Sequence, residues 1–208
     1  DGYWSRGLGD VYKRQIILDL EAGVADDRKA EGREVLGSVV ARLSPEVTTT
    51  VRINAGWDAA SLDLDAAVIP GVSALHLALC EDPDHVRKVA DCVSQLETER
   101  GIALGTIRLI AMLASPAAVL LAREIATASP RMAGLTLGME DYATTMGTTP
   151  NADLLRSACY QITQAARAAG IAPLAVPASK ANFCDAEEME SAAQWARRIG
   201  ALGGYAVH

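Results

Sequence analysis

The sequence predicts an α/β fold, and within that class a TIM (β/α)8 barrel that lacks its first strand and helix. Short apolar runs alternate with amphipathic stretches along almost the whole chain, which is typical of parallel strands joined by crossover helices. No Asn-Gly pair of the kind found in tight hairpins separates two apolar runs. A doubly wound open sheet is the alternative, but no Gly-x-Gly-x-x-Gly segment follows the first strand.

Seven strands and six helices are expected. The apolar and often β-branched runs that predict strands lie at 16–20, 48–53, 73–79, 107–112, 133–137, 172–176 and 204–207. The stretches with helical spacing lie at 26–43, 57–67, 84–100, 117–128, 153–169 and 186–199. Each strand after the first is thus separated from its predecessor by a helix, as right-handed crossovers require.

Local signals support individual elements. Asp26 stands at the start of the first helix, where a carboxylate favours the positive end of the helix dipole. Pro116 indicates that a helix begins at 117, because proline is preferred in the first turn of a helix. The strand at 133–137 is apolar throughout, which predicts burial on both faces. It stops at Gly138, and a long loop is expected after it.

The chain is expected to contain one domain, at 16–208. Residues 1–15 form a basic, glycine-containing stretch without periodicity, and 5–15 resembles a translated sequencing adaptor. We therefore expect 1–15 to be a non-native segment that should be left out of fold reasoning. Both ends of the domain are expected to be cut, so that the first strand and helix of the barrel would precede residue 16.

Composition limits the classes of partner. The net charge of −7 disfavours general nucleic-acid binding, which needs basic patches. No apolar run approaches the roughly 20 residues that span a bilayer, and no signal peptide is visible, so no membrane partner is expected. The sequence predicts a cytoplasmic protein.

Isolated reactive side chains are read as packing residues. The four cysteines have neither Cys-x-x-Cys spacing nor a nearby histidine pair, which predicts reduced thiols and no zinc site: Cys80, Cys92, Cys159 and Cys184. His76 is central in an apolar strand, which favours a core histidine over a catalytic base.

Acidic residues follow two of the expected strands: Glu21 follows 16–20, and Glu140 and Asp141 follow 133–137. The carboxyl ends of barrel strands are where such enzymes place their chemistry, so Glu140 and Asp141 are candidate site residues. Other interpretations stay open. Arg52 and Glu21 can form a structural ion pair, Glu140 or Asp141 can cap the next helix, and Asp19 can cap the first crossover helix, for which reason Asp19 is left outside the site.

Five motifs carry a family resemblance, in one order along 16–208: Asp19-Leu20-Glu21, Val51-Arg52-Ile53-Asn54, Ala122-Arg123-Glu124-Ile125-Ala126, Gly138-Met139-Glu140-Asp141-Tyr142 and Gly203-Gly204-Tyr205-Ala206-Val207-His208. Together they resemble the citrate lyase beta-subunit family, the acyl-CoA ester lyase branch of the HpcH/HpaI aldolase superfamily.

The resemblance implies an Mg²⁺-assisted carbon–carbon lyase. Its substrate would be a 3-hydroxyacyl-CoA of the citryl-CoA or malyl-CoA type, and its products an acyl-CoA ester and a 2-oxo acid. It implies Asp141 as a metal ligand, Arg52 as the group that binds the substrate carboxylate or carbonyl, and Glu21 as an acid on the metal side that orients a metal-bound water. It also implies a homo-oligomer.

Four positions depart from the family's pattern. Ala22 replaces an aspartate, Leu79 a lysine, and Gly204 a lysine that is common near the last strand. Ala114 stands where the family has the glutamate that is its second protein ligand of the metal. With one carboxylate in place of two, Mg²⁺ binding should weaken, since hard cations depend on ligand charge.

The sequence leaves two other functions to consider. The departures favour a non-catalytic barrel of the same descent that serves as a subunit or acid-binding partner. A metal-free aldolase that forms a Schiff base is disfavoured, because nothing near Lys180 in the sequence would lower its pKa.

Overall fold

The computed structural model describes residues 15–179 and 185–205, which form two compact units. The first unit comprises the described residues of Asp1–Ala78 and Arg87–Ile110, and the second those of Leu79–Val86 and Ala111–His208. Residues 1–14, most of the segment expected to be non-native, lie outside the described part of the chain. No helix of the described part is long and apolar enough to cross a membrane.

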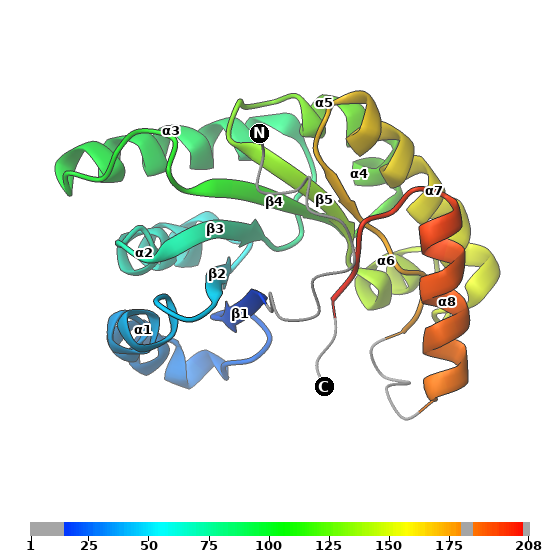
Figure 1. Ribbon diagram of the computed structural model, residues 1–208, viewed down its shortest axis with the longest axis horizontal. Coiled ribbons are helices and arrows are strands. Elements are labelled where there is room, and N and C mark those ends of the chain that lie inside the picture. The colour runs from blue at the N-terminus through cyan, green and yellow to red at the C-terminus, as the bar shows by residue number, and fades with distance from the viewer. Residues whose placement is uncertain (1–14, 180–184, 206–208) are drawn as a thin grey trace. The chain divides into compact units, whose positions relative to one another are not determined.

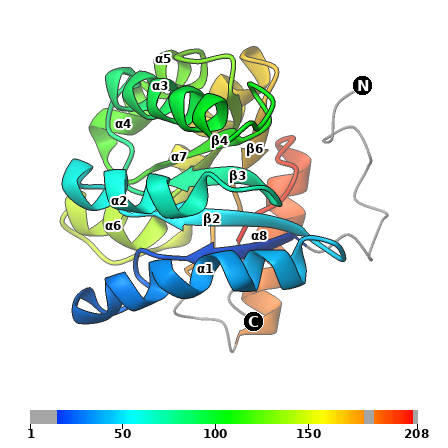
Figure 2. The same cartoon turned by 90° about the vertical axis from the view of Figure 1, so that its left-hand side faces the viewer.

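The first unit is built on three parallel strands: β1 (Gln15–Asp19), β2 (Thr48–Ile53) and β3 (Val72–Leu77). The short helix η1 (Asp26–Arg28) and α1 (Lys29–Leu43) connect β1 to β2, and α2 (Trp57–Ala67) connects β2 to β3. Helices α1 and α2 pack side by side against β2 (Figures 1 and 2). Most of α3 (Pro83–Glu99) also belongs to this unit.

The second unit has its core around β5 (Met132–Leu137), all six residues of which are buried. This strand pairs in parallel with β6 (Ala172–Leu174). Helix α5 (Ala122–Ala126) packs against α7 (Ala152–Ala168), and both contact β5. The remaining helices are α4 (Pro116–Leu120), α6 (Met139–Thr145) and α8 (Ala186–Arg198). Strand β4 (Arg108–Leu113) runs from the first unit into the second.

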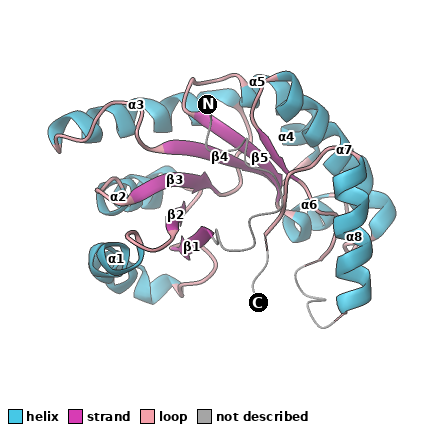
Figure 3. Ribbon diagram, viewed as in Figure 1, coloured by secondary structure: helices cyan, strands magenta, loops and turns pink. Residues whose placement is uncertain are grey.

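The α/β class is confirmed, but the TIM barrel is wrong for this chain. The described residues form one sheet of six strands in the order β1 to β6, with β1 and β6 at its edges. Strands and helices alternate along it as predicted (Figure 3). A closed barrel requires the last strand to pair with the first at a matching tilt and stagger, and here the sheet is open.

The seventh expected strand, at 204–207, does not form within the described residues. Gly203 makes a single parallel bridge to Leu174, and residues 206–208 lie outside the described part. A helix, α6, stands where a loop was expected after Gly138. Its two first-turn acids suit the helix dipole, and Tyr142 and Ala143 bury its inner face.

Candidate functional site

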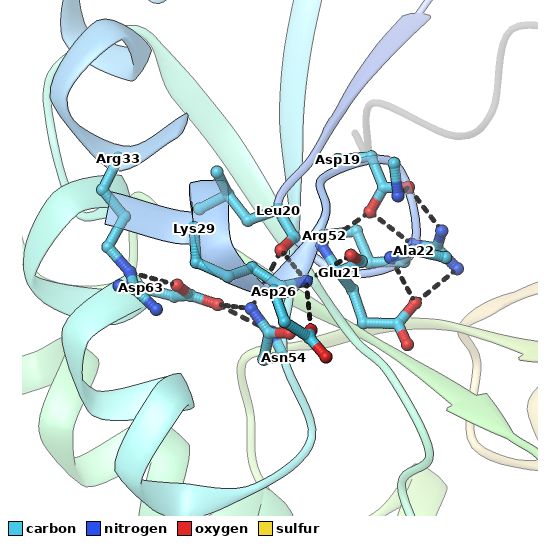
Figure 4. A network of polar contacts seen from close by, with 11 residues as sticks. Asp19, Leu20, Glu21, Ala22, Asp26, Lys29, Arg33, Arg52, Asn54 and Asp63 are labelled. Carbon is cyan, nitrogen blue, oxygen red and sulfur yellow. Dashed lines mark hydrogen bonds and ion pairs between the residues drawn. The ribbon is translucent and has the colours of Figure 1, made fainter. Parts of the chain in front are cut away.

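A charged cluster lies at the carboxyl ends of β1 and β2 (Figure 4). Asp19 and Arg52 are direct partners in the parallel register, so their side chains start from neighbouring strand ends. Arg52 donates from Nε to Asp19 Oδ1 at 2.8 Å and from Nη2 to Asp19 Oδ2 at 2.5 Å. Its Nη1 forms an ion pair with Glu21 Oε2 at 3.1 Å. The structure thus brings two predicted site residues, Arg52 and Glu21, together in the first unit.

Asp19 is the residue that the sequence interpretation missed. It is no helix cap, because η1 follows Ala25 and α1 follows Arg28, neither capped by a side chain. Its carboxylate instead accepts the backbone N–H groups of Glu21 at 2.9 Å and Gly23 at 2.7 Å. Burial acts to raise the pKa of Asp19, but the hydrogen bonds and charge of Arg52 and these backbone N–H groups outweigh it. The pKa is therefore lowered.

A second polar network holds the loop that follows β1, at residues 20–25. Asp63, fully buried on α2, accepts hydrogen bonds from Arg33 Nε at 2.7 Å and from the Asn54 backbone N–H and Nδ2 at 2.8 and 2.7 Å. Asn54 Nδ2 also donates to Leu20 O at 2.9 Å. Lys29 Nζ donates to Leu20 O at 2.9 Å and to the carbonyl of Glu21. Asn54 therefore links the loop after β1 to Asp63 on α2.

The helical spacing of the sequence could have predicted that Asp63 is buried. It lies three residues after Ala60 and four before Ala67, and both alanines are buried. An aspartate on the apolar face of a helix needs buried donors, and Arg33 and Asn54 supply them.

His76 is confirmed as a core histidine. Its ring is buried, and Nε2 lies 3.0 Å from Thr50 Oγ1. The Thr50 hydroxyl also lies 3.1 Å from Ile16 O, so the ring of His76 belongs to a hydrogen-bonded group inside the core.

In the second unit, Asp141 and Ala114 come together around Gly138. Ala114 follows β4 and is buried, whereas Asp141 is exposed in the first turn of α6. A Cβ placed on Gly138 would lie 3.2 Å from Ala114 Cβ and 3.6 Å from Asp141 Oδ2. The neighbouring Glu140 accepts a hydrogen bond from Ser179 Oγ at 2.8 Å. The position expected to hold a second metal ligand thus borders Gly138, as Asp141 does, but carries a methyl group.

These residues do not fit a two-carboxylate magnesium site. Mg²⁺ prefers oxygen ligands in octahedral geometry, and Ala114 offers no oxygen. Among residues 15–179 and 185–205, no group of three or more His, Cys, Asp or Glu side chains is arranged to hold a metal ion.

The other departures have distinct surroundings. Leu79, which directly follows β3 and Ala78, has a φ of +46° and is 36% exposed. Ala22 is exposed, and its backbone N–H donates to Glu21 Oε2 at 2.9 Å. Gly204 is exposed beyond the bridge to Leu174. Lys180 lies outside the described residues.

The described cysteines are free thiols, as predicted. Cys80 and Cys159 are buried, and burial raises the pKa of each to about 12. Cys92 is half-buried, and its pKa is also raised by burial. Cys184 lies outside the described residues.

The model of the family described as HpcH/HpaI aldolase/citrate lyase matches residues 14–208. The citrate lyase subunit beta of Haemophilus influenzae is 33% identical over 177 residues, which are 83% of this chain and 61% of that protein. A citrate lyase subunit beta-like protein of Mycobacterium tuberculosis is 31% identical over 195 residues, 89% of this chain and 63% of that protein. The chain thus spans about three fifths of the length of these curated relatives.

Solved structures agree. The citrate lyase beta subunit from M. tuberculosis, complexed with oxaloacetate and magnesium, superposes with a TM-score of 0.70 at 26% identity, over 92% of this chain and 80% of that one. The lead(II) complex of Haloferax volcanii malate synthase superposes with a TM-score of 0.81, over 92% of this chain and 60% of that one. At 19% identity that match shows a shared fold alone. The chain belongs to the HpcH/HpaI aldolase/citrate lyase family.

Proposed function

We propose that the protein is a carbon–carbon lyase that cleaves a 3-hydroxyacyl-CoA, of the citryl-CoA or malyl-CoA type, into an acyl-CoA and a 2-oxo acid. Family membership and relatives named citrate lyase subunit beta support the reaction class. The structural observation that carries the proposal is the Arg52 guanidinium, which Asp19 holds through two parallel hydrogen bonds at the carboxyl end of β2. An oriented guanidinium is suited to bind a substrate carboxylate.

The reaction assigns a task to each residue. Arg52 binds the carboxylate next to the hydroxyl-bearing carbon and thereby fixes its orientation. Glu21 accepts the hydroxyl proton as that carbon becomes the carbonyl of the 2-oxo acid. The bond to the α-carbon of the thioester breaks, and its electron pair passes into the enolate of the acyl-CoA, which then takes a proton at that carbon.

Magnesium is named with the M. tuberculosis citrate lyase beta subunit and not with this chain. Because Ala114 leaves Asp141 without a second carboxylate, no step of the proposed reaction passes through a metal ion. Asp141 remains our proposed ligand if the family's cation binds.

The direct test is cleavage by the purified protein. Citryl-CoA and malyl-CoA are supplied with and without MgCl₂, and the 2-oxo acid is trapped as its phenylhydrazone. We expect turnover by the unaltered chain and a fall in kcat/KM of about 100-fold for Arg52→Ala, since truncating a charged partner costs roughly 2–5 kcal/mol. Arg42→Ala removes an exposed arginine of α1 and should leave kcat/KM within about twofold.

A second candidate function is a non-catalytic member of the same family that acts as a subunit or binds an acid. The observation in its favour is Ala114, which puts a methyl group next to Gly138, where the second metal ligand was expected. Under this alternative no 2-oxo acid forms from either thioester with or without MgCl₂, although the protein is folded by circular dichroism. That result would overturn the lyase proposal.

A further inference from the structure

Arg52 holds the carboxylates of Asp19 and Glu21 unequally. Asp19 receives two parallel hydrogen bonds, from Nε and Nη2, in the bidentate geometry that is strongest for an arginine–carboxylate pair. Glu21 receives one contact, from Nη1 to Oε2 at 3.1 Å. The Glu21 pair is therefore the weaker of the two and the easier one to exchange.

Asp19 is also fixed from its other side. Oδ1 accepts both Arg52 Nε and the Glu21 N–H, and Oδ2 accepts both Arg52 Nη2 and the Gly23 N–H. Each oxygen thus has two donors, so that removing this carboxylate from Arg52 would break four hydrogen bonds. Asp19 is built into the site as a support for the guanidinium.

The backbone that carries Glu21 is held as well. The Leu20 N–H donates to Arg52 O at 2.9 Å, and Leu20 O accepts from Lys29 Nζ and Asn54 Nδ2. The Glu21 N–H is bound by Asp19, and its carbonyl accepts from Lys29 Nζ. Displacing Glu21 from Arg52 therefore needs rotation of a side chain that is 27% exposed and loss of the 2.9 Å hydrogen bond from the Ala22 N–H to Oε2, with no change of the loop.

We propose that the Glu21 carboxylate occupies the place of a substrate carboxylate on Arg52, and that the 2-oxo acid or its precursor displaces it on binding. This inference rests on the proposed function and names a further step in it. Once released from Arg52, Glu21 stands beside the bound acid, in position to accept the hydroxyl proton. Asp19 stays on Arg52 throughout and keeps the guanidinium oriented.

A side chain that competes with the ligand weakens the apparent affinity. The intrinsic affinity is multiplied by the fraction of molecules in which that side chain is already displaced. Glu21→Gln keeps the size and shape of the side chain but removes the charge that competes for Arg52. We expect this variant to bind a free acid roughly two- to fivefold more tightly, in line with a partly exposed ion pair of up to about 1 kcal/mol. If the chain turns over substrate, kcat should fall while KM falls too, because the same carboxylate accepts the proton.

The experiment is isothermal titration of glyoxylate and of oxaloacetate into the unaltered chain and three variants. Asp19→Asn removes the other carboxylate on Arg52 and should weaken binding, since it frees the guanidinium to turn. Glu34→Gln removes the same unit of charge from an exposed site on α1 and should leave Kd unchanged. General electrostatics would instead tighten binding in all three variants.

The outcomes separate the two proposals. Tighter binding by Glu21→Gln alone supports displacement, including the case in which only this variant binds measurably. If the unaltered chain binds an acid and Glu21→Gln binds it equally or more weakly, displacement is overturned while acid binding at Arg52 stands. If neither protein binds either acid and both are folded, both proposals fall.

Discussion

Two aspartates organise the polar residues of the first unit. Asp19 supports Arg52 from beside it, and Asp63 supports the loop through Asn54 and Arg33. Neither aspartate was placed at the site by motif reasoning, because their roles depend on partners about ten to thirty residues away along the chain. Both lead to expectations for stability that do not depend on the reaction.

Asp63→Ala should lower the free energy of unfolding by about 3–5 kcal/mol, because it leaves the half-buried cation of Arg33 and the Asn54 amide without their acceptor. Urea denaturation measures the change. Asp65→Ala, on the same helix, breaks an ion pair to Arg100 whose aspartate is 73% exposed, and should cost less than about 1 kcal/mol. Equal losses in the two variants would contradict a supporting role for Asp63.

Asp19 should make stability depend on pH in the acid range. Its folded pKa is lowered below the ordinary 3.8, so it stabilises the fold above that value, and the contribution is lost as pH falls through the folded pKa. The free energy of unfolding of the unaltered chain should therefore fall toward that of Asp19→Asn below about pH 4. Urea titrations from about pH 6 to about pH 3 test this, and a constant difference would contradict it.

Among the elements, the connection after β3 is strained at Leu79. A φ of +46° suits glycine and costs other residues roughly 1–2 kcal/mol. Such strain is often found at functional positions, and Leu79 lies two residues after the end of β3.

The strain predicts that glycine stabilises the fold more than alanine at position 79, the reverse of their usual order within a helix. Leu79→Gly and Leu79→Ala both delete the side chain, so they differ chiefly in backbone preference, and the glycine variant should be more stable by about 1 kcal/mol. At Leu62, exposed within α2, the alanine variant should instead be more stable by about the same amount. Thermal melts of the four variants check this, and the same order at both positions would contradict it.

The ends of β4 and β5 allow a test of the metal position. Ala114→Glu should place a carboxylate within reach of Asp141, since both sites border Gly138, and so produce a rise in melting temperature with MgCl₂ or MnCl₂. The shift is compared with and without metal in each variant, because a glutamate at this buried position destabilises the fold by itself. Ala114→Gln is the matched control. A shift that survives Asp141→Ala in the Ala114→Glu background would show that the metal binds elsewhere.

For the whole molecule, the acidic charge bears on assembly. A net charge of −7 makes copies of the chain repel one another, and salt screens that repulsion. The homo-oligomer expected from the resemblance should therefore be more populated at high than at low ionic strength. Light scattering after size-exclusion chromatography should give a mass that is a multiple of 21.9 kDa, and a monomer at all salt concentrations would contradict the prediction.

The sequence by itself determined the elements. Six of the seven expected strands lie within about two residues of their predicted bounds, because apolar runs and helical spacing are local properties that burial enforces. The family also followed from residues that are adjacent in the chain, such as those around Arg52 and Asp141.

Tertiary structure alone decided how the strands assemble and how Arg52 is occupied. An open six-stranded sheet and a closed barrel use the same strand–helix repeats, so local patterns cannot separate them, and the difference depends on which edges pair. Likewise, the residues next to Asp19 in the sequence suggest that it caps the first crossover helix. Only the parallel register, which sets Asp19 opposite Arg52, makes Asp19 the partner that holds the guanidinium and leaves Glu21 with one ion pair to Arg52.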